Sequence, residues 1–167
     1  MNKIILSLSL VIFALSMFAQ DVPAVQLKDL NGKTVNTKSI INNNGKPVLI
    51  SFFATWCKPC IKELNAFNEN YDDWKEETGV RIIAISTDNS RSSNSVGPFV
   101  KSKGWEFDVY LDENGDFKRA MNVGEVPHTF LLDGKGKIVW QHKTYLDGDE
   151  NKTFDVIKKV SKGQPIK

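Results

Sequence analysis

The sequence predicts one α/β domain in which a central mixed sheet is flanked by helices. Residues 47–53 and 80–85 are nearly continuous apolar runs, as in strands buried on both faces. Between them, apolar residues recur at intervals of three and four, the pattern of an amphipathic helix. Turn signals at Asn31-Gly32 and at residues 134–136 add hairpins near the two ends. Strands separated by helices, together with hairpins, indicate helices packed on both faces of a mixed sheet.

The composition excludes several classes of protein. The chain has 167 residues, 41% of them hydrophobic and 25% charged, which excludes collagen, a coiled coil and a wholly disordered chain. Lys and Arg number 22 against 20 Asp and Glu, and the signs are mixed along the chain, so no nucleic-acid partner is expected. Two cysteines and two histidines barely supply one metal site. Because His128 and His142 lack the spacing of zinc ligands, we expect neither a metal nor another cofactor.

The N-terminus has the pattern of a signal peptide. A basic residue precedes an uncharged run over residues 4–19, and the first acidic residue is Asp21. The run is shorter than the about 20 apolar residues of a membrane-spanning helix, and serines interrupt it. We therefore expect residues 1–19 to be a signal peptide, cleaved after Ala19 or alternatively after Ser16, and residues 20–167 to form the domain. An uncleaved membrane anchor is the other possibility. In either case the domain would work outside the cytoplasm, where disulfides persist.

Turn residues and periodicity predict the elements of the first half. Asn-Gly is a strong hairpin signal, and a polar turn precedes the first buried strand. The stripe after Cys57 has the spacing of one apolar face on a long helix. Its members are Ile61, Leu64, Phe67, Tyr71 and Trp74. The predicted elements are a hairpin at 25–29 and 34–36, a strand at 47–53 and a helix from Cys57 to near Gly79.

The second half alternates strands with shorter helices. Strands are expected where apolar runs stand between polar turns, and helices where apolar residues are spaced by three or four. A polar surface loop is expected at 86–95, directly after the second buried strand. The last apolar stripe consists of Phe154, Ile157 and Val160 and predicts a C-terminal helix. The other predicted elements are strands at 80–85, 107–111, 129–133 and 137–142, and helices at 96–103 and 117–121.

The segment Trp56-Cys57-Lys58-Pro59-Cys60 lies where the buried strand gives way to the long helix. The unpaired N–H groups of a first helical turn, with their partial positive charge, stabilise a thiolate at Cys57. Pro59 suits that turn because its missing N–H is not needed there. An inert, structural disulfide is the alternative. A disulfide that encloses only two residues adds little to the stability of the fold, whereas one that closes a loop of about 15 residues adds about 3 kcal/mol. Redox chemistry is therefore the preferred interpretation.

A helix end acts on the redox equilibrium more than on the rate of attack. Lowering a thiol pKa from about 8.5 to about 7 raises its thiolate fraction about 16-fold at neutral pH. The same drop in pKa makes each thiolate about 5-fold less nucleophilic, for a Brønsted coefficient of about 0.45. The rate of attack therefore rises only about 3-fold. The same change makes the thiolate a better leaving group and stabilises the dithiol, which sets the reduction potential.

A strand, Trp-Cys-x-x-Cys, a helix and then Val126-Pro127 before a late strand resemble the thioredoxin fold over nearly all of residues 20–167. Within that superfamily the chain is similar to the exported TlpA/ResA-like thiol–disulfide oxidoreductases. This likeness is carried by the N-terminal hairpin, the segment 45–57 and an inserted helix and strand within 95–111. The resemblance implies a thioredoxin fold with these two additions and an exchange of disulfides with other proteins.

The resemblance also implies roles by position. Cys57 would be the exposed attacking thiol, and Cys60 the resolving thiol that breaks the mixed disulfide. Pro127 matches the family's cis-proline, which would turn the Val126 backbone toward the sulfurs to pair with an extended substrate. An ordinary strand-initiating proline is the alternative. Trp56 would pack beside the dithiol, or alternatively act only as a half-buried aromatic that shields the helix end.

Ser51 departs from the superfamily pattern. Thioredoxin keeps a buried Asp at this position, six residues before the first cysteine, and a serine cannot take the proton of Cys60 at neutral pH. Glu63, three residues after Cys60, stands where ResA-like proteins carry a functional glutamate. Helical spacing puts Glu63 near enough to influence that proton directly or through water. The alternative is a first-turn acid that complements the helix dipole.

The resemblance implies a periplasmic protein-disulfide reductase that serves cytochrome c maturation or repairs misoxidised cysteines. We expect a monomer that receives electrons from a membrane donor. Two alternatives stay open, namely an oxidase that donates disulfides and a binding module that holds a peptide without turnover. A thiol peroxidase is disfavoured because Ala54 replaces the hydroxyl residue three positions before its reactive cysteine. His128 is expected on the surface. The polar loops at 88–95 and 144–151 are expected to be solvated, and the alternative is that they border a partner.

Overall fold

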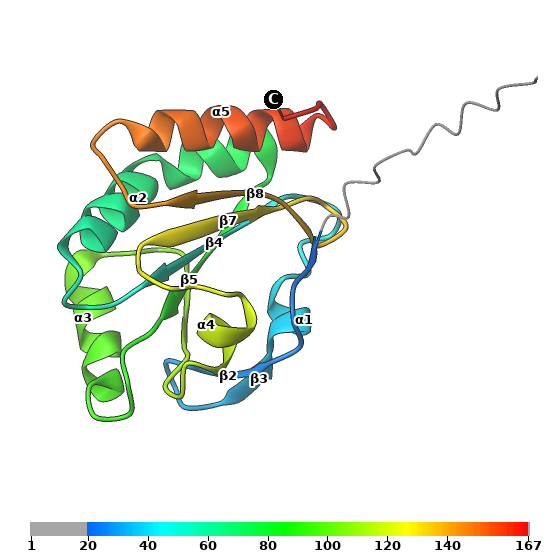
Figure 1. The fold of residues 1–167 in the computed structure, drawn as a ribbon. Helices are drawn as coiled ribbons and strands as arrows, with labels where there is room; N and C mark the ends of the chain where they lie inside the picture. The colour runs from blue at the N-terminus through cyan, green and yellow to red at the C-terminus, as the bar shows by residue number, and fades with distance from the viewer. Residues whose placement is uncertain (1–19, 167) are drawn as a thin grey trace, which may run out of the picture.

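The computed structural model describes residues 20–166, so the predicted signal peptide lies outside the described residues. They form an eight-stranded sheet in the order β1-β8-β7-β4-β5-β6-β2-β3 (Figure 1). Strand β4 pairs in parallel with β5, and β5 with β6, whereas the other pairs are antiparallel. The strands are β1 (Gln20–Asp21), β2 (Gln26–Asp29), β3 (Thr34–Asn36), β4 (Val48–Phe53), β5 (Arg81–Ser86), β6 (Asp108–Leu111), β7 (His128–Leu132) and β8 (Lys137–Lys143). The helices are α1 (Thr37–Ile40), α2 (Lys58–Thr78), the short 3-10 helix η1 (Ser93–Ser95), α3 (Val96–Lys103), α4 (Asp116–Ala120) and α5 (Asp149–Ser161).

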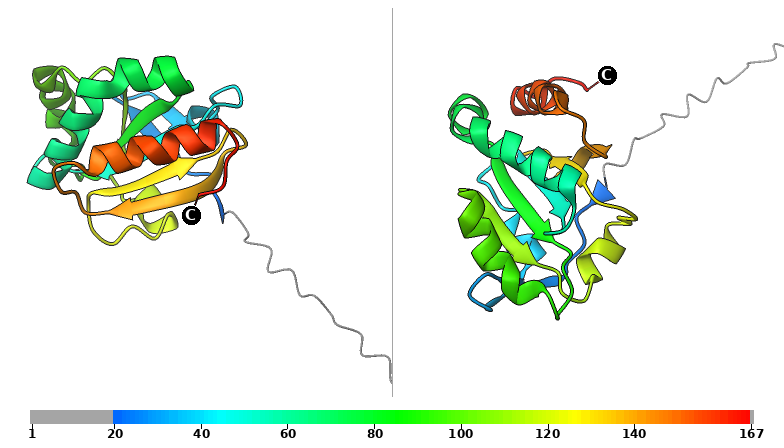
Figure 2. Two further views of the ribbon diagram at one scale, coloured as in Figure 1. Left: turned by 90° about the horizontal axis from the view of Figure 1, so that it is seen from above. Right: turned by 90° about the vertical axis from the view of Figure 1, so that its left-hand side faces the viewer.

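Helices cover both faces of the sheet, as the sequence predicts. Helices α2, α3 and α5 lie on one face and α1 and α4 on the other (Figures 1 and 2). Strand β4 contributes to both cores because successive side chains point to opposite faces. Leu49 and Phe53 enter the core under α2, whereas Ile50 and Phe52 enter the core under α4. Alternation therefore places Ser51 on the α2 face, in the middle of the sheet.

Helix α2 begins beside Cys57 and ends at Gly79, as predicted. Cys57 is its N-cap residue, and Gly79 ends it with a φ of 70°, a left-handed conformation that glycine adopts without steric cost. The apolar face of α2 is buried against the sheet and against α5. The rings of Trp74 and Phe154 stack with their centroids 5.0 Å apart. This packing fixes the direction of α2 and hence the position of its N-terminus.

The predicted elements are all present, with bounds that differ by at most one residue. The sequence did not predict α1 and β1, which are too short to show a periodic pattern. Helix α1 has four residues and relies on its N-cap, Asn36, whose side chain accepts a hydrogen bond from the backbone N–H of Lys38. Strand β1 has two residues and exists by pairing with the edge of β8. No helix within residues 20–166 has both the length and the apolar character needed to cross a membrane.

Candidate active site

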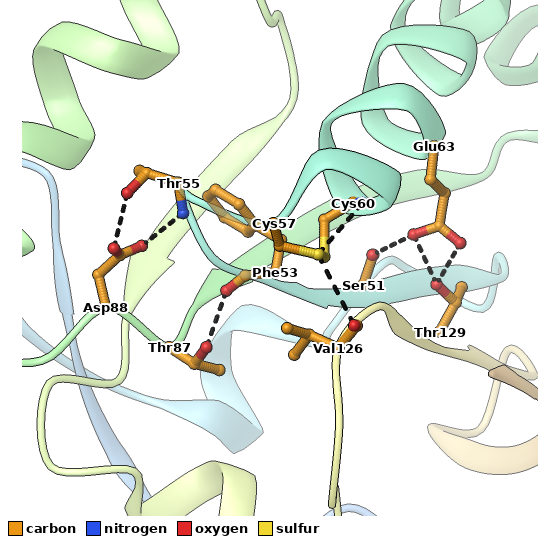
Figure 3. The surroundings of a disulfide bond; sticks show 10 residues. All are labelled: Ser51, Phe53, Thr55, Cys57, Cys60, Glu63, Thr87, Asp88, Val126 and Thr129. Carbon is orange, nitrogen blue, oxygen red and sulfur yellow. Dashed lines mark hydrogen bonds between the residues drawn. A yellow bond between two sulfur atoms is a disulfide. The ribbon is translucent and has the colours of Figure 1, made fainter. Parts of the chain in front are cut away.

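Cys57 and Cys60 form a disulfide at the N-terminus of α2 (Figure 3). Their sulfurs are 2.04 Å apart and their Cα atoms 5.3 Å apart. The Sγ of Cys57 accepts a hydrogen bond from the backbone N–H of Cys60 at 3.3 Å. The backbone N–H of Cys57 donates to the carbonyl of Ala54 at 3.0 Å, which closes the turn between β4 and α2. The N–H groups of the helix end therefore face the sulfur that becomes negative on reduction.

Only a small part of the dithiol reaches solvent. Cys57 is 5% exposed and Cys60 is fully buried. The expectation of an exposed Cys57 is therefore wrong, although Cys57 is less deeply buried than Cys60. Trp56 is 73% exposed, so the alternative of a half-buried aromatic is wrong. An exposed indole next to the dithiol offers an apolar contact surface to a polypeptide.

The loop that precedes β7 lies against Cys57. The Val126–Pro127 peptide bond is cis, as the resemblance implies. The carbonyl oxygen of Val126 lies 3.7 Å from the Sγ of Cys57 (Figure 3). On the other side of the loop, the backbone N–H of Thr144 donates to the carbonyl of Pro127 at 3.1 Å. The loop is thus held beside the disulfide with a backbone acceptor next to the more accessible sulfur.

Glu63 lies on α2 beyond Cys60 and points toward the sheet (Figure 3). It is 1% exposed. The hydroxyl of Ser51 donates to one carboxylate oxygen at 2.7 Å, and the hydroxyl of Thr129 lies 3.1 Å from both oxygens. The first turn of α2 contains no acidic residue, so the alternative of a first-turn acid is wrong. Glu63 instead occupies the interior, opposite the serine that replaces the usual aspartate.

Burial controls the protonation of Glu63. Removal from water raises the pKa of its carboxyl to about 7, although the hydrogen bonds from Ser51 and Thr129 favour the charged form. The nearby negative charge of Asp149 adds to the rise. A carboxyl that titrates near neutral pH can both accept and release a proton under working conditions. The site therefore contains a carboxyl with a pKa of about 7, three residues beyond the buried Cys60 on α2.

Asp88 and Thr129 also belong to this region, and the sequence analysis misses both. Asp88 is 1% exposed, and Ser93, Tyr145 and Asp149 are also buried, so the expectation of solvated loops at 88–95 and 144–151 is wrong at these positions. The carboxylate of Asp88 accepts hydrogen bonds from the backbone N–H and the hydroxyl of Thr55, at 2.9 and 2.7 Å. Because parallel strands end at a common sheet edge, the loop after β5 had to come close to the turn after β4. Alternation along β7 could likewise have placed Thr129 opposite Ser51, its partner in β4.

His128 is buried, so the expectation of a surface side chain is wrong. It begins β7, which lies between β4 and β8 and is covered on both faces. Its ring stacks on Phe130 with centroids 4.2 Å apart, and Nε2 lies 3.0 Å from the side-chain oxygen of Gln141. Burial lowers the pKa of the imidazole and favours its neutral form. In the part of the chain that the structure describes, no three His, Cys, Asp or Glu side chains are grouped to hold a metal ion.

Comparisons with known proteins agree with this geometry. The AhpC/TSA family matches residues 18–141, which include both cysteines and the proline loop. The thiol-disulfide oxidoreductase ResA of Bacillus thuringiensis (strain Al Hakam) is 38% identical over 122 residues, covering 73% of this chain and 67% of that protein.

Solved structures show the same fold. A thioredoxin-like protein from Porphyromonas gingivalis is 49% identical, with a TM-score of 0.76, and the match covers 87% of this chain and 94% of that one. A putative thiol:disulfide interchange protein DsbE from Chlorobium tepidum has a TM-score of 0.74 at 24% identity, over 86% of this chain and 96% of that one. The chain has a thioredoxin-like fold and belongs to the AhpC/TSA family, among the ResA-like thiol–disulfide oxidoreductases.

Proposed function

We propose that this protein reduces protein disulfides in the cell envelope by dithiol exchange through Cys57 and Cys60. The observation that carries the proposal is the Cys57–Cys60 disulfide at a helix N-terminus, in which Cys57 is 5% exposed and Cys60 is fully buried. A dithiol placed in this way gains a stabilised thiolate at the accessible sulfur and a protected resolving thiol. The reducing direction is supported by the resemblance to the TlpA/ResA-like subfamily.

The exchange proceeds in two displacements. In the reduced protein, the Cys57 thiolate attacks one sulfur of a substrate disulfide, forms a mixed disulfide and expels the other substrate sulfur as a thiolate. Cys60, once deprotonated, attacks the Sγ of Cys57, restores the internal disulfide and expels the second substrate thiolate. The substrate gains two electrons and, after protonation, two thiols, while the two protein sulfurs lose those electrons.

Glu63 is proposed to take the proton of Cys60 before the second displacement. Its carboxyl lies on the same helix as Cys60, and its pKa of about 7 lets it be charged in a large fraction of molecules at neutral pH. Ser51 and Thr129 hold the carboxylate in one orientation through their hydroxyls. We propose that one water carries the proton from Cys60 to Glu63, because a general base can act through a single water.

Trp56, Val126 and Pro127 are proposed to receive the substrate. The Val126 carbonyl, 3.7 Å from the Sγ of Cys57, can accept a hydrogen bond from the backbone of an extended segment that carries the target cystine. The exposed indole of Trp56 can cover an apolar neighbour of that cystine. Backbone pairing supplies affinity without demanding one sequence, which suits an enzyme with several client proteins.

The proposed location and partners rest on the sequence pattern and on the relatives. The N-terminal pattern at residues 1–19 supports export. The resemblance to the exported TlpA/ResA-like oxidoreductases supports a role in the envelope, such as cytochrome c maturation. A reductase outside the cytoplasm needs an external source of electrons, which we propose to be a membrane protein. The proposed working form is a monomer.

The midpoint potential of the Cys57–Cys60 couple tests the direction of flow. Equilibration with glutathione buffers, followed by acid quenching and alkylation of free thiols, gives the fraction of dithiol at each ratio. A value of about −270 mV, like that of a thiol reductant, is expected. A value of about −120 mV would show a strong oxidant and would contradict the reductase proposal in favour of disulfide donation.

A further inference from the structure

Asp88 is a buried acid beside the dithiol that the exchange reaction does not use. It is 1% exposed, and it takes part in none of the ion pairs found among residues 20–166. A buried carboxyl without a cation is costly unless hydrogen bonds compensate for the lost water. The partners of Asp88 therefore indicate what this residue does.

The carboxylate of Asp88 is directed at the turn that leads to Cys57 (Figure 3). One oxygen accepts the backbone N–H of Thr55 at 2.9 Å and the hydroxyl of Ser86 at 2.8 Å. The other oxygen accepts the hydroxyl of Thr55 at 2.7 Å. Ser86 in turn accepts the backbone N–H of Asp88 at 3.1 Å, which fixes the acid itself. Two of the three bonds to the carboxylate thus come from Thr55, two residues before Cys57.

The turn between β4 and α2 depends on the loop after β5 for its anchors. Thr87 donates its backbone N–H and its hydroxyl to the carbonyl of Phe53, at 2.8 and 3.0 Å. Asp88 holds the next anchored residue along the turn, Thr55. Beyond it, Trp56 is 73% exposed, and Cys57 is buried again. Thr55 is therefore the last residue before the attacking cysteine that is hydrogen-bonded to the loop after β5.

We propose that Asp88 is a positioning residue that, through Thr55, fixes the Cys57 end of the dithiol and favours the disulfide over the dithiol. Formation of an internal disulfide depends on the effective concentration of one thiol at the other, and a fixed backbone raises that concentration. The inference deepens the proposed function, on which it rests, by naming a group that makes the couple more reducing.

Two substitutions separate position from charge. Asp88→Asn removes the charge, but its amide can still accept from the N–H of Thr55 and donate to the hydroxyl of Thr55. Asp88→Ala removes the charge and both hydrogen bonds to Thr55. In glutathione buffers we expect Asp88→Ala to shift the equilibrium constant about fivefold toward the dithiol, or about 20 mV. The equilibrium constant of Asp88→Asn is expected to stay within about twofold of that of the natural protein, which corresponds to about 9 mV.

Two further variants control for folding. Asp112 is another buried acid, which accepts the backbone N–H groups of Phe117 and Lys118 at 3.1 and 2.7 Å and does not contact Thr55. Asp112→Ala is therefore expected to lower stability and to leave the thiol equilibrium within about twofold. Where Asp88→Ala does not fold, Thr55→Val removes one hydrogen bond and is expected to shift the constant about threefold in the same direction. Thr55→Ser restores the hydroxyl and should restore the natural value.

Several results would overturn the proposal. They are a folded Asp88→Ala or Thr55→Val protein with an unchanged equilibrium constant, and an Asp112→Ala protein that shifts as far as Asp88→Ala. An Asp88→Asn protein that shifts as far as Asp88→Ala would also overturn it, because charge rather than position would then act. The equilibrium with glutathione is measurable even if the natural protein reduces no protein substrate, so failure of the proposed function would be seen separately.

Discussion

Replacing Cys60 with serine is expected to leave Cys57 joined covalently to its substrate. The Cys57 thiolate can still attack a substrate disulfide, but without the second sulfur the mixed disulfide is not resolved. Turnover should therefore be lost while an adduct accumulates. The Cys60→Ser protein is incubated with insulin whose disulfides are intact. Non-reducing electrophoresis and mass spectrometry should then show the adduct, and dithiothreitol should release it.

The matched variant is Cys57→Ser. Because Cys60 is fully buried, its sulfur cannot reach a protein substrate, and no adduct is expected. Equal trapping by both variants would contradict the assignment of attacking and resolving thiols. Unchanged capture of partners by a protein without either sulfur would favour the binding module over exchange chemistry.

The Glu63→Gln protein is expected to lose less stability with rising pH than the natural protein does. The folded protein raises the pKa of Glu63 from 4.5 to about 7, so between these values it binds more protons than the unfolded chain. The stability that protonated Glu63 contributes is fully present below pH 4.5 and is lost as the pH rises through 7. The loss amounts to about 3 kcal/mol in the free energy of unfolding, because Glu63 is almost fully buried.

Urea unfolding of the oxidised proteins at pH 4.5 and pH 8 measures this difference. Glu76→Gln, on the exposed side of α2, controls for the loss of a carboxylate from the same helix. Parallel stability curves for the natural protein and Glu63→Gln would contradict the proposed protonation. At pH 7, Glu63→Gln should also reduce insulin about 10²-fold more slowly, the usual contribution of a general base.

The fold and the centre of the site follow from sequence patterns with direct physical causes. A strand buried on both faces must be apolar at nearly every position, and β4, in which only Ser51 is polar, is therefore recognisable from residues 47–53 alone. The spacing of the apolar face of α2 and the stop at Gly79 define the long helix in the same way. The position of Cys57 at the junction of these two elements is therefore predictable, and so is its helix-capping geometry.

The surrounding polar network depends on tertiary packing. Asp88 lies in a stretch rich in Ser and Asn, and only the approach of β5 to β4 turns one of these polar residues into a buried anchor. His128 resembles a surface residue in its local sequence, but its strand lies in the interior of the sheet. The interior position of Glu63 becomes visible only when Ser51 and Thr129 are paired across β4 and β7. Local patterns do not specify which polar side chains meet in space.

Reduction of insulin by the purified protein in the presence of dithiothreitol tests the central claim most directly. If Cys57 and Cys60 exchange electrons with foreign cystines, the insulin B chain should precipitate faster than with dithiothreitol alone, and Cys57→Ser should abolish the gain. Precipitation at the rate of dithiothreitol alone, by protein shown to be folded, would contradict the account.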